Sequence, residues 1–156
     1  MILQVENDFY REGLKEINPL YDSNAAGKIS DQNYRRNCLS FLDTKNNTDE
    51  LSQKDFLECT RIVEEAENCI SDLGLALYYI KCIGRAGKIT KLQDWLCDNL
   101  SKSDYLNNIT KILDIFEYKR IIVVNTLCSL SYVCYQNYKV AEEVLDCKFW
   151  PRLKQQ

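Results

Sequence analysis

Glycine and proline are scarce in this chain, which has five glycines and two prolines among 156 residues. A β-sandwich or β-barrel needs a turn about every 8–12 residues, and these two residues supply the strongest turn signals. Several long segments instead repeat apolar residues at steps of three and four, as one face of an α-helix does. The chain is therefore predicted to be all-α, with no sheet beyond an incidental pair of strands.

Local signals indicate where the predicted helices begin. Asp31 and Asn137 are typical first residues of a helix, and Ser52 and Thr90 each begin a capping-box pattern. Asp72–Ala86 is apolar nearly all round, which predicts the central helix. The predicted helices are Leu3–Ile17, Ser30–Leu42, Ser52–Ile70, Asp72–Ala86, Thr90–Leu100, Ser103–Phe116, Arg120–Gln136 and Tyr138–Cys147, with loops at Tyr21–Lys28 and Asp43–Glu50.

Seven or eight antiparallel helices joined by short connections stack in one of two ways. They form either a short α-solenoid of the armadillo or HEAT type or a closed helical bundle, and the periodicity leaves both open. The length is that of a single domain covering residues 1–156. Because the chain stops at Gln156, where a further helix would begin, a piece or terminal part of a longer helical-repeat protein is an alternative.

Charge and cysteine content limit the partners and the cellular compartment that we expect for the protein. The formal net charge of −3 gives no general attraction to phosphate backbones or anionic bilayers, so no nucleic-acid or membrane partner is expected. No segment reaches the roughly 18 uninterrupted apolar residues of a membrane span. The eight cysteines are spread along the chain without a Cys-x-x-Cys pair, which favours free, mostly buried thiols in the cytoplasm, with the nucleus as an alternative.

The sequence offers little catalytic chemistry. It contains no histidine, the commonest general base and the commonest neutral metal ligand. Asp94 and Asp98 lie four residues apart and the Glu64–Glu67 segment is acidic, but both patterns are typical of solvated helix faces. No phosphate-binding loop is present, since Gly84–Lys88 lacks the required spacing. We therefore expect no enzyme activity, no cofactor and no metal site.

Four features follow one another between Val124 and Leu153. They are the Leu-x-x-Leu pattern with a small residue at Leu127–Ser131, the turn residue Asn137, the short helix Val140–Leu145 and the Trp-Pro-x-Leu start of a further helix at Trp150–Leu153. In this order they resemble the junction between two armadillo repeats. The resemblance implies a helical-repeat fold and a protein or peptide partner. It departs from the family where Asp146-Cys147-Lys148 replaces the usual glycine, and in having Asn125 and Ser129 where nuclear-import adaptors carry Trp and Asn, so binding of nuclear signals is not implied.

The leading functional hypothesis is a non-enzymatic protein-interaction scaffold. Asn125, Ser129, Tyr132 and Gln136 recur along one face of the Arg120–Gln136 helix and are the predicted partner-binding residues, because Val124, Leu127 and Leu130 would form the opposite, core-facing stripe. Two alternatives stay open. One is a small helical enzyme or regulator with a site built from carboxylates and tyrosines, and the other is a helical bundle that binds a partner helix in a hydrophobic groove.

Overall fold

The computed structural model describes residues 9–10, 12–14, 27–46, 50–102, 105–135 and 137–155. Within these ranges the protein is all-helical and contains no strand, which confirms the predicted fold class. The elements are α2 (Gln32–Thr44), α3 (Gln53–Asn68), α4 (Leu73–Gly87), the 3₁₀ turn η1 (Thr90–Leu92), α5 (Gln93–Lys102), α6 (Tyr105–Ile115), α7 (Arg120–Cys134), α8 (Tyr138–Asp146) and α9 (Trp150–Leu153).

Side-chain caps start most of these helices where the sequence predicted them. The Ser52 hydroxyl accepts a hydrogen bond from the backbone N–H of Asp55 at 3.1 Å, and Asp31, Asp72 and Asn137 cap α2, α4 and α8 in the same manner. The capping box predicted at Thr90 is wrong. Thr90 lies inside the 3₁₀ turn, which begins without a side-chain cap because the chain turns inward there to bury Ile89 and Leu92.

The predicted N-terminal helix is described only in part. Residues 9–10 and 12–14 are helical, and the Tyr10 ring lies 4.8 Å from the Phe116 ring, which places this segment against the end of α6. The rest of Leu3–Ile17, most of the predicted loop Tyr21–Lys28, and the predicted helix start at Ser103 lie outside the described residues.

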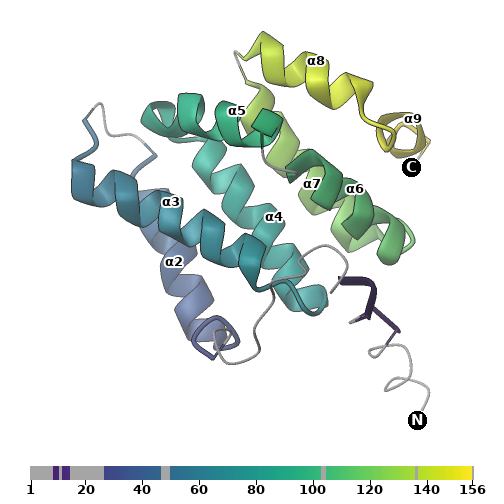
Figure 1. Ribbon diagram of the computed structural model, residues 1–156, viewed down its shortest axis with the longest axis horizontal. Helices are drawn as coiled ribbons and strands as arrows, with labels where there is room; N and C mark the ends of the chain where they lie inside the picture. Colours follow the sequence, from purple (N-terminus) through teal and green to yellow (C-terminus); the bar gives the residue numbers. More distant parts are fainter. Residues whose placement is uncertain are drawn as a thin grey trace.

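Helices α2, α4 and α7 form a row in which α4 contacts both of the others. In the view of Figure 1 this row lies behind α3, α5 and α6, and α8 with α9 lies at the upper right edge. Helix α4 also contacts α3 and α5, which confirms the prediction that it is the central helix. Among the described helices, the row ends at α7, so the side of α7 that faces away from α4 has no further helix of the row beside it.

The contact between α4 and α7 is the most extensive one between two helices, and it depends on glycine. A Cβ atom added to Gly84 would lie 2.6 Å from Oγ and 3.0 Å from Cα of Ser129, and one added to Gly87 would lie 2.9 Å from Cγ2 of Val133. Neither glycine has a positive φ angle. These two glycines therefore allow the backbones of α4 and α7 to approach closely. Gly87 is also the last residue of α4.

All eight cysteines lie in the described part of the chain, and none forms a disulfide. Cys38, Cys59, Cys69 and Cys82 are buried around α3 and α4, whereas Cys128 is exposed. Burial raises the pKa of the Cys59 thiol to about 11 and also raises that of Cys82, so these groups stay protonated at neutral pH. They behave as small apolar core residues. The prediction that most of the thiols are buried holds for four of the eight, since Cys97, Cys134 and Cys147 are half-buried and Cys128 is exposed.

Candidate partner-binding surface

The four predicted partner-binding residues do not form one exposed stripe. Ser129 is 5% exposed, and its hydroxyl donates a hydrogen bond of 2.8 Å to the backbone carbonyl of Ile80 in α4. The amide of Asn125 donates to the carbonyl of Ile121 in its own helix, also at 2.8 Å. Tyr132 is exposed, with the Lys88 ammonium 4.1 Å from the centre of its ring. Gln136 lies outside the described residues.

The predicted core stripe of α7 is likewise wrong at two of its three positions. Leu130 is buried, but Val124 and Leu127 are 49% and 40% exposed. The buried face instead follows Ile122, Thr126, Ser129, Leu130 and Val133, with Val123 beside it.

The physical reason lies in α4 rather than in α7. Helix α7 is apolar nearly all round, so hydrophobicity alone does not choose a face. Gly84 and Gly87 bring the α4 backbone so close that only a small or slender side chain fits opposite them, and Ser129 and Val133 supply that surface. The glycine pair was the sequence signal for this contact, since closely spaced glycines permit close backbone approach.

Turning this face toward α4 leaves three other apolar side chains of α7 exposed. Val124 and Leu127 point away from α4 together with Ile121, which is 51% exposed. Beside them, α7 and α8 border a groove of about 340 Å³. We call it the α7–α8 groove, and its lining residues are Leu127, Leu130, Ser131, Cys134, Ala141, Val144, Leu145 and Trp150.

The α7–α8 groove is built for apolar contact rather than for acid–base chemistry. No carboxylate or cationic side chain lines it, and burial raises the pKa of its Cys134 thiol. The indole Nε1–H of Trp150 is buried, and no described residue accepts a hydrogen bond from it. Buried indole N–H groups usually have an acceptor, so this donor lies unsatisfied beside an apolar groove.

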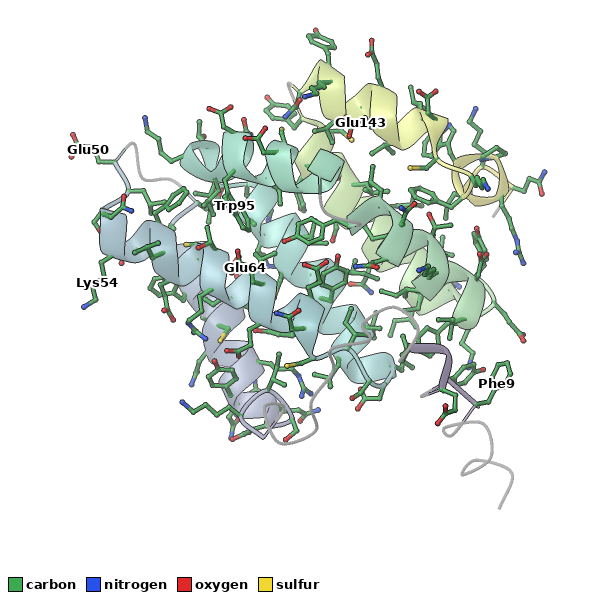
Figure 2. The ribbon with its side chains drawn as sticks, viewed as in Figure 1. Phe9, Glu50, Lys54, Glu64, Trp95 and Glu143 are labelled. Atoms are coloured by element: carbon green, nitrogen blue, oxygen red, sulfur yellow. The ribbon has the colours of Figure 1, made fainter. Side chains whose placement is uncertain are left out.

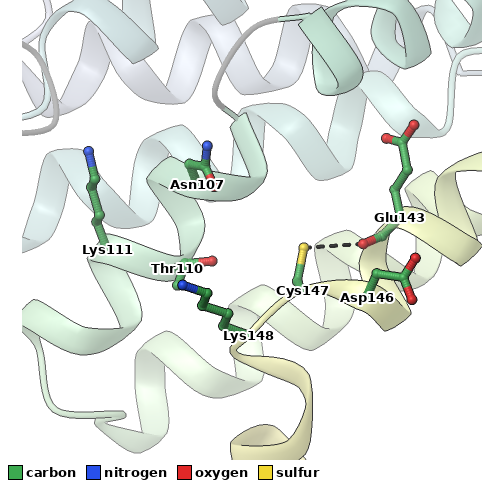
Figure 3. Close-up of a pocket in the computed structure, with 7 residues that line it drawn as sticks. All are labelled: Asn107, Thr110, Lys111, Glu143, Asp146, Cys147 and Lys148. Carbon is green, nitrogen blue, oxygen red and sulfur yellow. Dashed lines mark hydrogen bonds between the residues drawn. The ribbon is translucent and has the colours of Figure 1, made fainter.

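A larger hollow of about 560 Å³ lies between α6 and the end of α8. Figure 3 shows that the carboxylates of Glu143 and Asp146 do not converge on a common point, while Lys111 lies on the opposite side. The Cys147 thiol donates to the backbone carbonyl of Glu143 at 3.2 Å, and burial raises its pKa. This hollow combines charges of both signs without a buried polar group aimed into it.

The acidic residues considered at the sequence level serve the fold or face solvent. Glu65 accepts hydrogen bonds from the Tyr34 hydroxyl at 2.7 Å and from Arg61 at 2.6 Å, and Glu67 accepts one from the buried amide of Asn108. Glu64 of α3 and Glu143 of α8 lie well apart in Figure 2. Within the described ranges, no group of three or more His, Cys, Asp or Glu side chains is placed to hold a metal ion.

Comparisons with known protein families, with characterised proteins and with solved structures find no match for this chain. The armadillo resemblance of the Val124–Leu153 segment therefore stays a prediction. In the part of the chain that the structure describes, no helix has the length and apolar character needed to cross a bilayer. The fold and surface define the class of an all-α protein with exposed apolar side chains along one face of α7.

Proposed function

We propose that this protein is a non-enzymatic interaction module that binds an amphipathic helix of another protein in the α7–α8 groove. The observation that carries the proposal is the exposure of Leu127 and Leu145 in a groove that no charged side chain lines. Contiguous exposed apolar surface is unfavourable in water unless a partner covers it. Of the three functions that the sequence left open, this geometry favours the helix-binding groove.

The dimensions of the groove suit a helix better than a small molecule. A volume of about 340 Å³ lies at the low end of small-molecule pockets, and the groove is bordered by two helices rather than enclosed. A partner helix inserts apolar side chains three and four residues apart into such a surface.

The environment proposed for this interaction is the cytoplasm or the nucleus. Eight thiols without a disulfide are compatible with a reducing compartment, where a partner would meet the protein in its reduced form.

The test uses exposed leucines as matched positions. Helical peptides selected from a display library of amphipathic sequences should bind the wild-type protein, and Leu127→Lys and Leu145→Lys should each weaken that binding about tenfold or more. Leu57→Lys is the control, because Leu57 is 56% exposed on α3, outside the groove. Fluorescence anisotropy with labelled peptides measures the affinities, and melting temperatures verify that all three variants fold.

Two outcomes contradict the proposal. If the selected peptides lose the same affinity for Leu57→Lys as for Leu127→Lys, the groove is not their binding site. If sedimentation shows a dimer that Leu127→Lys dissociates, the occupant of the groove is a second copy of this chain instead of a partner helix.

A further inference from the structure

A second groove lies between α2 and α4, on the opposite side of α4 from its contact with α7. We call it the α2–α4 groove; its volume is about 330 Å³. Its lining residues are Gln32, Arg35, Arg36, Leu39, Gly74, Leu77, Tyr78 and Lys81. Three of these are cations and none is a carboxylate, although the chain as a whole has a formal net charge of −3.

In the part of the chain that the structure describes, none of the three cations has a carboxylate partner. Among the described residues, neither Arg36 nor Lys81 forms an ion pair. Arg36 is exposed and Lys81 is half-buried. Arg35 is held in place, because its guanidinium donates a hydrogen bond of 2.7 Å to the backbone carbonyl of Ile29.

The acids nearest to this groove in the sequence are engaged elsewhere. Asp31 accepts a hydrogen bond from the N–H of Asn33 at the start of α2, and Asp72 accepts one from the N–H of Leu75 at the start of α4. Asp43, one helix turn beyond Leu39, lies 3.0 Å from Nε of Arg85. None of these three carboxylates forms an ion pair with Arg36 or Lys81.

Positive charge continues from the groove along α4. Lys81, Arg85 and Lys88 follow one another at steps of four and three, which places them on one face of the helix. Arg85 is compensated by Asp43, and Lys88 lies over the Tyr132 ring of α7. Of these three residues, Lys81 is the one that lines the α2–α4 groove.

We propose that the α2–α4 groove binds an acidic segment of a partner protein that places an apolar side chain between its carboxylates. Half-buried Leu39 and Leu77 provide the apolar floor, and Arg36 and Lys81 provide the charge-assisted donors for the carboxylates. A nucleic acid is the weaker fit, because three cations in a chain of net negative charge compensate few phosphates and offer no extended basic surface. The site is separate from the α7–α8 groove and does not depend on the function proposed there.

The probe is a fluorescein-labelled soluble peptide of repeated Asp-Glu-Leu triplets, and its neutral copy with Asn and Gln is the control. The acidic peptide should bind the full chain saturably, and added salt should weaken the binding. Arg36→Glu and Lys81→Glu should each reduce the affinity about tenfold or more, since each removes one charge-assisted bond and adds repulsion. Lys139→Glu, on exposed α8, makes the same change of charge outside the groove and should leave the affinity within about twofold.

The proposal is overturned if the acidic peptide does not bind, if the neutral copy binds equally well, or if Lys139→Glu weakens binding as much as Lys81→Glu does. A single-stranded DNA oligonucleotide of the same charge serves as a competitor. If the oligonucleotide binds more tightly than the peptide, and if Arg36→Glu also abolishes the binding of the oligonucleotide, the groove is a nucleic-acid site instead. Arg36 is exposed, so its variant keeps the test informative even if Lys81→Glu fails to fold.

Discussion

Thr126 is fully buried on the α4-facing side of α7, and its hydroxyl has no hydrogen-bond partner in the described part of the chain. A buried hydroxyl without a partner costs about 1–3 kcal/mol. Thr126→Val keeps the shape and removes the polar atom, so we expect it to raise the free energy of unfolding by about 1 kcal/mol. Chemical denaturation measures the change.

Thr60 provides the matched comparison for that variant. It is also a buried helical threonine, but its hydroxyl donates to the backbone carbonyl of Leu57 at 2.9 Å. Thr60→Val should therefore lower the free energy of unfolding by about 1 kcal/mol. Equal effects of the two substitutions would show that Thr126 has a partner in solution.

Cys59 links the stability of the protein to alkaline pH. Burial raises the pKa of its thiol to about 11, above the value of about 8.5 for an unfolded cysteine. The folded state thus holds the proton more tightly. The resulting stabilisation of about 3 kcal/mol is fully present below about pH 8.5 and is lost as the pH rises toward 11.

The experiment compares wild-type protein with Cys59→Ala. Denaturation midpoints measured from about pH 8 to about pH 11 should fall more steeply for the wild type than for the variant, even though the variant is less stable at neutral pH. Parallel pH profiles would mean that Cys59 does not contribute to the alkaline loss of stability.

At the scale of the elements, Gly84 tests how tightly α4 and α7 pack. Alanine is the better helix former by about 1 kcal/mol, yet its Cβ at position 84 would lie 2.9 Å from Cβ of Ser129. We expect Gly84→Ala to lower the free energy of unfolding by about 1–3 kcal/mol, because α7 must shift to accept it. Gly74→Ala is the control, since its nearest neighbour is the Asp72 carboxylate at 3.3 Å, and its effect should stay within about 1 kcal/mol.

The orientation of α7 leads to a second prediction at this scale. Ile122 is fully buried, whereas Leu127 is 40% exposed beside the α7–α8 groove. Ile122→Ala should cost about 2–5 kcal/mol of stability, because it leaves a cavity in the core. Leu127→Ala should cost about 1 kcal/mol, since its surroundings open to solvent. Thermal and chemical denaturation measure both, and a larger loss for Leu127→Ala would restore the core stripe that the sequence predicted.

Helix ends were predictable from the sequence because capping is local. Ser52 and Asn137 need only the N–H three residues ahead, and the structure shows both bonds. Thr90 has the same local pattern but does not cap, because burial of Ile89 and Leu92 draws the chain into a 3₁₀ turn. Glu117 and Tyr118 end α6 with positive φ angles, a role that favours glycine and that no sequence signal announced.

For the whole molecule, we predict one cooperative unit. The buried apolar residues form a single cluster that extends from Leu14 to Leu153. Helix α4 lies between α2 and α7 and contacts both of them. The two tryptophans report on separate regions, because Trp95 (Figure 2) belongs to α5 and Trp150 begins α9. Each single-tryptophan variant, Trp95→Phe and Trp150→Phe, should give the same denaturation midpoint by fluorescence as by far-ultraviolet circular dichroism.

In Trp95→Phe, Trp150 is the remaining fluorescent reporter. A fluorescence midpoint at a lower denaturant concentration than the circular dichroism midpoint of this variant would contradict the prediction. It would mean that α8 and α9 detach before the rest of the helices unfold. The comparison therefore tests the single-domain organisation that the length of the chain predicted.

The amino-acid sequence by itself determined the all-α class, the central position of α4 and most helix starts, because periodicity and capping depend on residues close together in the chain. It also indicated thiols rather than disulfides. Which face of α7 is buried was decided only in the tertiary structure. Helix α7 is apolar nearly all round, and its orientation follows from the close approach of Gly84 and Gly87 to Ser129 and Val133, residues more than forty positions away in the chain. That choice left Val124 and Leu127 exposed and so created the surface proposed to bind a partner.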